Sequence, residues 1–105
     1  MDMKIEREGP VMRVFASGEL IGLACNTLRD TIKSAVDDST ASLSKVVIDL
    51  SGLSFIDSSG IGVLMGLKAH LRTRKVEFTL VNPSPKILQI LKVTRLDKVF
   101  GLSDG

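Results

Sequence analysis

Hydrophobic residues along the chain follow two periods, and segments with one period alternate with segments that have the other. Period-two alternation and continuous β-branched runs predict strands, whereas apolar residues three and four positions apart predict helices. The predicted strands are 3–7, 11–17, 45–50 and 77–81, and the predicted helices are 23–36, a helix from 57 to about 74, and 86–93. The segment 18–22, with two glycines, is expected to be a loop, and residues 96–100 predict a short closing strand or helical turn.

The order of these elements predicts an α/β fold. The turn signal Glu8-Gly9-Pro10 favours an antiparallel hairpin of the first two strands. Later strands alternate with helices, which is typical of parallel strands covered by helices. We therefore expect a mixed, largely parallel sheet of four to five strands with three to four helices and an initial β-hairpin. The length of 105 residues suits one domain, residues 1–105.

One junction in this pattern carries a concentration of polar and small residues. The run Asp57-Ser58-Ser59-Gly60 follows a hydrophobic strand and opens an amphipathic helix. Asp and Ser commonly cap helix N-termini, so the run is explained by capping alone. A helix start after a parallel strand is equally where an anion site or working loop is expected. Both interpretations stay open at this point.

Composition excludes several classes of function. The net charge of +2, scattered basic residues and absence of Trp and Tyr argue against nucleic-acid binding. The one cysteine, Cys25, and one histidine, His70, leave no cluster that suits a metal. The charged N-terminus has no signal-peptide core, and no apolar run reaches membrane-spanning length. We expect a cytoplasmic protein with no membrane association.

Enzymatic chemistry lacks the residues that it needs. Neither Ser58 nor Ser59 stands in a Gly-x-Ser-x-Gly elbow. His70 lies twelve residues beyond Ser58 on the same helix, roughly 18 Å away, so it cannot serve as the base. A dinucleotide site needs a third glycine at a fixed spacing and an acid at the end of the next strand. The sequence around Gly60-Ile61-Gly62 has neither. We expect no enzyme activity, no cofactor and no metal.

The outward face of the helix after the junction carries little charge. Ile61, Gly62, Met65 and Ala69 share the side of Ser58. A solvated helix face normally carries more charge, so exposed Ile61 and Met65 beside a glycine favour a protein docking face. The alternative is that the glycines allow close packing of the helix on the sheet. Phosphate on Ser58 would add about −1.5 to −2 charge beside Asp57 and oppose docking.

At these residues the sequence resembles the STAS-domain family, in particular the bacterial anti-sigma factor antagonists. The resemblance covers nearly the whole chain and is most specific at Leu53-Ser54-Phe55-Ile56-Asp57-Ser58-Ser59-Gly60-Ile61-Gly62. Gly18-Glu19-Leu20, Val46-Val47-Ile48-Asp49-Leu50 and Asn82-Pro83-Ser84 carry the rest of the resemblance.

This resemblance implies a partner switch. The unphosphorylated antagonist binds an anti-sigma factor that is also a serine kinase of the histidine-kinase-like ATPase type. The kinase phosphorylates the serine after the Asp, here Ser58, and a metal-dependent serine phosphatase resets it. The ATP therefore belongs to the partner kinase. Asp57, Ser59 and Gly60 match the flanking motif positions, and Glu19 and Ile21 match a loop that lies near the phosphoserine.

Two departures from the family pattern concern the surroundings of this motif. Ile21 stands where family members often have Asp, and Arg95 stands where they often have Gly. We expect Ile21 to affect partner choice or phosphorylation rate, and Arg95 to affect the turn after the third helix. The resemblance leaves one alternative function, a STAS module that binds a small ligand such as a nucleotide or serves a transport complex.

Overall fold

A computed structural model describes residues 1–38 and 42–100. It contains four strands and four helices within that part of the chain. In chain order they are β1 (Asp2–Glu8), β2 (Val11–Leu20), α1 (Leu23–Asp37), β3 (Lys45–Ile56), α2 (Ser58–Thr73), β4 (Glu77–Val81), α3 (Pro85–Val93) and α4 (Leu96–Val99). The expected α/β class, the initial hairpin and the alternation of strands with helices are confirmed.

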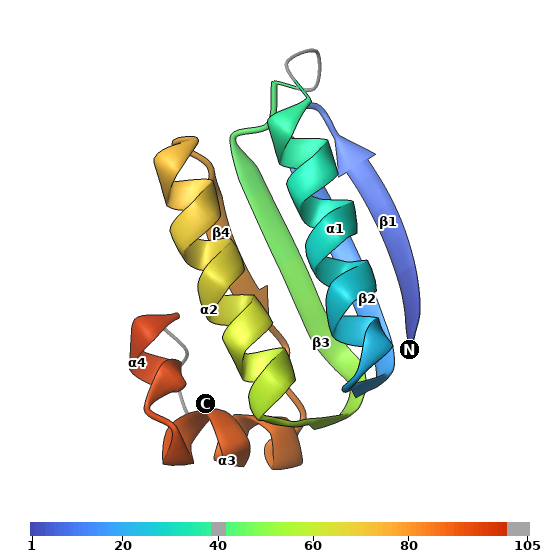
Figure 1. Ribbon diagram of the computed structural model, residues 1–105, viewed down its shortest axis with the longest axis vertical. Helices are drawn as coiled ribbons and strands as arrows, with labels where there is room; N and C mark the ends of the chain where they lie inside the picture. Colours follow the sequence, from blue (N-terminus) through green and yellow to red (C-terminus); the bar gives the residue numbers. More distant parts are fainter. Residues whose placement is uncertain (39–41, 101–105) are drawn as a thin grey trace.

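The sheet has the order β1-β2-β3-β4, with β1 antiparallel to β2 and the other neighbours parallel. Helices α1 and α2 run side by side in the same direction across one face, and both begin at the end where β2 and β3 finish (Figure 1). Between the helices and the sheet lies one continuous core. Its fully enclosed members include Val14, Leu28, Ile32, Ile48, Leu64, Leu71 and Ile87.

Strand β3 is longer than its sequence pattern predicted. The expected strand ended at Leu50, but pairing with β2 continues to Ile56. The register places Phe15 opposite Asp49, then Ser17 opposite Gly52, and later Gly18 opposite Leu53 but Glu19 opposite Phe55. Each step leaves one extra residue on β3, so two β-bulges interrupt the alternation of side chains. The polar residues that follow Leu50, which usually end a strand, lie in the bulged part of β3 instead.

Side chains stabilise both bulges. In the first, the Asp49 carboxylate accepts bonds from the Ser51 N–H at 2.9 Å and from Asn82 Nδ2 at 3.1 Å. Burial raises the pKa of Asp49, but these hydrogen bonds and nearby Arg13 bring it below its ordinary value overall. In the second, the Ser54 hydroxyl donates to the Gly18 carbonyl at 3.0 Å. The bulges are therefore fixed features and not irregularities.

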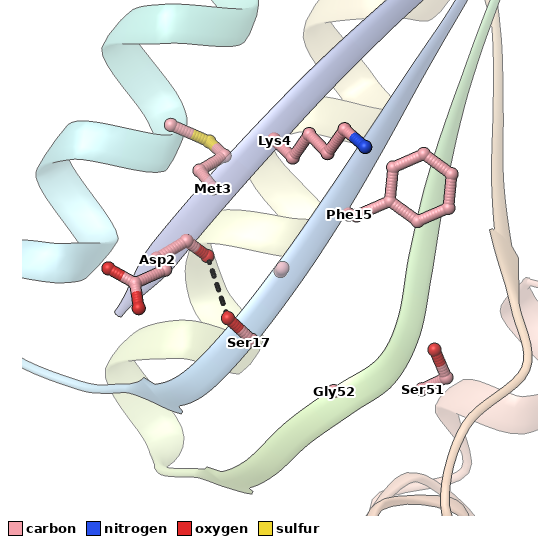
Figure 2. Close-up of a pocket in the computed structure, with 8 residues that line it drawn as sticks. Asp2, Met3, Lys4, Phe15, Ser17, Ser51 and Gly52 are labelled. Atoms are coloured by element: carbon pink, nitrogen blue, oxygen red, sulfur yellow. Dashed lines mark hydrogen bonds between the residues drawn. The ribbon is translucent and has the colours of Figure 1, made fainter.

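Glycine is required at one position in this bulged stretch. A Cβ on Gly52 would lie 2.9 Å from the Cβ of Ser17 on the neighbouring strand. Figure 2 shows this region, with Gly52 on β3 and Ser17 on β2, whose hydroxyl donates to the Asp2 carbonyl on β1 at 3.4 Å. Strands β1, β2 and β3 are thus held in close lateral contact near the end that carries the junction.

The opposite ends of α1 and α2 are joined by a polar cluster. Asp37 at the end of α1 bonds His70 at 2.9 Å and Arg74 at 3.2 Å. The hydrogen bond from His70 lowers the pKa of Asp37 below its ordinary value, and Arg74 adds to this effect. His70 therefore pairs with α1 at the end of α2 that is remote from Ser58.

The final helices follow the sequence signals. Ser84 caps α3 by accepting the Ile87 N–H at 3.3 Å, and Pro85 occupies the first turn, as expected. Of the two alternatives predicted for the closing element, the structure has the helical turn, α4. Arg95, which stands where family members often have Gly, adopts φ 62° in the turn between α3 and α4. A side chain in this left-handed conformation costs about 1 kcal/mol, so the turn is retained with some strain.

Candidate functional site

The N-terminus of α2 is a capped turn with two exposed hydroxyls. Asp57 is the N-cap, and its Oδ1 accepts the Gly60 N–H at 3.0 Å. Ser58 and Ser59 occupy the first two helical positions and are exposed. Within the described residues, their backbone N–H groups have no hydrogen-bond partner. The turn thus presents two hydroxyls beside free donors at the positive end of the helix dipole.

Gly60 holds this turn against the end of β2. A Cβ at this position would lie 2.6 Å from the Leu20 carbonyl oxygen and 2.7 Å from Cγ1 of Ile56. Real Cβ atoms do not approach a backbone oxygen so closely, so only glycine permits this contact. The close helix–sheet packing that was the alternative explanation for the glycines therefore applies to Gly60.

Gly62 and Gly66 have a different environment. A Cβ on either glycine would meet nothing within 4 Å, and both residues are exposed. Close packing within this chain therefore does not explain them. Glycine inside a helix costs roughly 1 kcal/mol relative to alanine, so the open space above both residues favours a function outside this chain.

The segment 18–22 is mostly strand, which corrects the expected loop. Gly18, Glu19 and Leu20 complete β2, and Leu20 is buried where Gly60 meets it. The second bulge on β3 lets β2 stay paired with β3 beyond Gly18, where the glycines had predicted a loop. The contact between Leu20 and Gly60 places Ile21, which is 36% exposed, at the same end of the molecule as the Ser58 turn.

Of the predicted docking residues, one is half-buried and the others are exposed. Met65 is 47% exposed, and Gly62 and Ala69 are also exposed. The expectation that Ile61 is exposed is wrong, because it is half-buried and packs against the core. Ala69 lies roughly 16 Å from Ser58 along the helix axis, so it is not part of the turn itself.

The sequence patterns did not predict two features of this surface. Leu23 is 82% exposed at the first position of α1, at the end of the molecule that carries the turn. A hollow of about 310 Å³ lies between α1 and α2, lined by Ser59, Gly62, Gly66, Arg29 and Lys33 among others. The available signal for Leu23 was its place outside the apolar face, where a solvated helix normally has a polar residue.

The chemistry available at the turn is limited to the hydroxyls. The Asp57 carboxylate serves as the helix cap, and His70 lies at the other end of α2. Cys25 is 4% exposed inside the core, and burial raises its pKa. Residues 1–38 and 42–100 contain no cluster of ligands that could hold a metal ion. The same residues contain no helix that is long and apolar enough to cross a membrane.

Comparison with known proteins places this geometry in a family. The STAS domain profile matches residues 2–104. The anti-sigma F factor antagonist of Lysinibacillus sphaericus is 34% identical over 92 residues, which cover 88% of this chain and 75% of the relative. The chain belongs to the STAS domain family.

Two solved structures share the fold. The anti-sigma factor antagonist SpoIIAA in its unphosphorylated form superposes with a TM-score of 0.77 at 22% identity, over 98% of this chain and 100% of the other. The phosphorylated form of the Bacillus cell fate determinant SpoIIAA gives a TM-score of 0.73 at 24% identity, over 92% and 86% of the chains. Both confirm the α/β fold.

The contact of Gly60 with Leu20 makes a prediction about stability. Gly60→Ala should lower the free energy of unfolding by roughly 2 to 3 kcal/mol, because the carbonyl of a paired strand cannot move aside. The matched control is Gly66→Ala on the same helix, which enters open space and should raise stability by about 1 kcal/mol. Urea unfolding of both variants provides the measurement. Equal effects at the two positions would contradict the assigned contact.

Proposed function

We propose that this chain is an anti-sigma factor antagonist that acts by partner switching. The unphosphorylated chain binds an anti-sigma factor that is also a serine kinase, and phosphorylation of Ser58 releases it. The observation that carries the proposal is the exposed Ser58 hydroxyl on a capped turn that has free N–H donors and no base. The names of the relatives support the assignment, and one of them has been solved in both phosphorylation states.

The geometry of the turn suits a substrate of phosphoryl transfer. The Ser58 Oγ attacks the γ-phosphorus of ATP on the kinase, the bond to the β-phosphate oxygen breaks, and ADP leaves while the kinase takes the hydroxyl proton. This chain supplies only a hydroxyl in a fixed position. Because Gly60 and the Asp57 cap hold the turn, little conformational entropy has to be lost when the kinase binds it.

Phosphate at Ser58 is compatible with the fold. The free N–H groups of Ser58 and Ser59 and the helix dipole favour an anion at this position. The same phosphate opposes docking, because Asp57 adds like charge and an apolar partner surface would have to desolvate both groups. Binding therefore changes while the structure does not.

The docking face extends from the turn along the exposed side of α2. It comprises Ile21, Leu23, Gly62 and Met65, which combine apolar side chains with an open helix backbone. Such a surface lets the backbone of a partner approach closely. We further propose a histidine-kinase-like ATPase as the kinase, a metal-dependent serine phosphatase as the resetting enzyme and the cytoplasm as the location, on the strength of the family resemblance.

The acceptor residue can be identified directly. Incubation with ATP and a serine kinase of the proposed type that binds this chain should add one phosphate, and tandem mass spectrometry should place it on Ser58. Ser58→Ala should accept none, because no other hydroxyl occupies the same position. Ser59→Ala is the matched control and should still be modified. Phosphate elsewhere, or transfer to Ser58→Ala at the wild-type rate, would refute the assignment.

The docking face makes a separate prediction. Met65→Asp should weaken binding of the kinase by about thirtyfold, because it places a charge where an apolar contact forms. The control is Val93→Asp on α3, which also charges an exposed apolar position, 78% exposed, but lies outside the face. Calorimetric titration measures both variants, with thermal unfolding as the check on folding. Equal losses for both variants would place the docking surface elsewhere.

A further inference from the structure

The outer edge of β1 is an exposed strand edge that the proposed function does not use. β1 stands first in the order of the sheet, and no strand lies beyond it in the part of the chain that the structure describes. It forms the rim of the sheet on the side away from α2 (Figure 1). Six of its seven residues are exposed, and Ile5 is 45% exposed. An open edge of this kind is a template for another strand.

The turn between β1 and β2 determines which backbone groups of β1 point outward. Glu8 pairs with Val11 across the two-residue turn Gly9-Pro10. The alternative hydrogen-bond pattern for this pair would need a bond between the two adjacent turn residues, and Pro10 has no N–H. Glu8 and Val11 therefore exchange both of their backbone hydrogen bonds.

The same pattern extends along the whole of β1. Pairing with β2 continues without a bulge as far as Asp2. Because successive residues of a strand turn their backbone groups to opposite sides, Lys4 and Glu6 direct their N–H and C=O groups to β2. Met3 and Ile5 direct theirs away from the sheet. The outward edge thus offers donors and acceptors at positions that are open to solvent.

The side chains of β1 divide between the two faces of the sheet. Ile5 lies opposite Val14, which is fully enclosed in the core under the helices, so Ile5 is on the helix side. Lys4 and Glu6 are on the other face, 3.5 Å apart, with side chains 76% and 51% exposed. The edge therefore carries an apolar residue at its centre and opposite charges on either side of it.

We propose that β1 pairs with β1 of a second copy of this chain, in antiparallel orientation and with Ile5 opposite Ile5. The two Ile5 residues exchange both backbone hydrogen bonds, because their outward groups face each other across the two-fold axis. In this register, Lys4 of each copy lies opposite Glu6 of the other. Opposite charges directly across an antiparallel pair stabilise it.

The charges of β1 select this register. A shift by two residues in either direction places Lys4 opposite Lys4 or Glu6 opposite Glu6 at the centre, and it also removes backbone pairs. Like charges directly opposite each other destabilise a strand pair. In the proposed register, the like-charged Asp2 and Glu8 meet only at the two outer ends. Charged residues on an edge strand usually prevent pairing, but here their order matches the order of a second copy.

The other edge of the sheet limits the assembly to two copies. On β4, Phe78 and Leu80 are 5% and 2% exposed, so that edge is not open to a further strand. Pairing through β1 alone is closed by its two-fold axis and gives a dimer. Two seven-residue strands make a small interface, so we expect a dissociation constant on the order of 100 µM.

The first experiment measures self-association of the full chain. Sedimentation velocity from about 20 µM to 1 mM should show a shift from monomer to dimer. Over the same range, hydrogen exchange measured by NMR should slow at the amides of Met3 and Ile5. A chain that stays monomeric at 1 mM, or a dimer with unchanged exchange at Ile5, would overturn the proposal. The assay contains no kinase, so its outcome does not depend on the proposed function.

A proline tests the outward donor. Ile5→Pro removes an N–H that points away from β2, so the β1–β2 pairing remains and the dimer should weaken at least about tenfold. The matched control Ile5→Val keeps the N–H and should dimerise within about threefold of wild type. NMR spectra and thermal unfolding check the fold of both variants. Dimerisation of a folded Ile5→Pro variant at the wild-type level would contradict strand pairing.

A charge exchange tests the register, and it decides the question if the proline variant does not fold. Lys4→Glu places like charges opposite each other at both positions and should weaken the dimer about fivefold or more. The double variant Lys4→Glu/Glu6→Lys restores opposite pairs and should return the affinity to within about threefold of wild type. If the double variant does not recover affinity relative to Lys4→Glu, the proposed register is wrong.

Discussion

The close approach of Gly60 to the Leu20 carbonyl is the constraint on which the functional end of the molecule depends. With no Cβ at residue 60, the first turn of α2 lies directly against the end of β2. This contact fixes the direction of α2 over the sheet and brings Ile21 to the same end as Ser58. The two bulges in β3 serve the same arrangement, because they allow β3 to stay paired with β2 as far as the junction.

The Asp57 cap and the exposed face of α2 have different electrostatic roles at this end of the molecule. The Asp57 carboxylate accepts the Gly60 N–H, so it orders the turn. The free N–H groups and the helix dipole accept negative charge at Ser58, whereas the weakly charged face beside it does not. A single modification can therefore remove a partner at little cost to the fold. Its effect on binding arises from where the charge is placed.

Much of the fold was predictable from the sequence, because period and turn signals are local. The hairpin, the order of strands and helices, and the caps at Asp57 and Ser84 all follow from short-range patterns. The continuation of β2 to Leu20 and of β3 to Ile56 was not predictable in this way. There, the glycines and serines that usually end a strand instead form bulges, and their backbone groups are satisfied by residues distant in sequence.

The candidate site was predictable in part for the same reason. The capped turn and its serines are a local motif, but the role of each glycine depends on what lies opposite it. Gly60 faces a carbonyl and Gly62 faces open space, although both belong to one helix. Ile61 proved half-buried and Leu23 exposed because the angle of each helix on the sheet decides which residues at the edge of an apolar face reach solvent.

We propose that charge at Ser58 changes binding and leaves the fold intact. The most direct test titrates a kinase partner that cannot transfer phosphate with the unphosphorylated chain and with the chain phosphorylated at Ser58, and measures the unfolding of both forms. We expect a loss of affinity of about a hundredfold or more on phosphorylation. We also expect the free energies of unfolding of the two forms to agree within about 1 kcal/mol. Equal affinities, or a phosphorylated chain that has lost its folded structure, would contradict it.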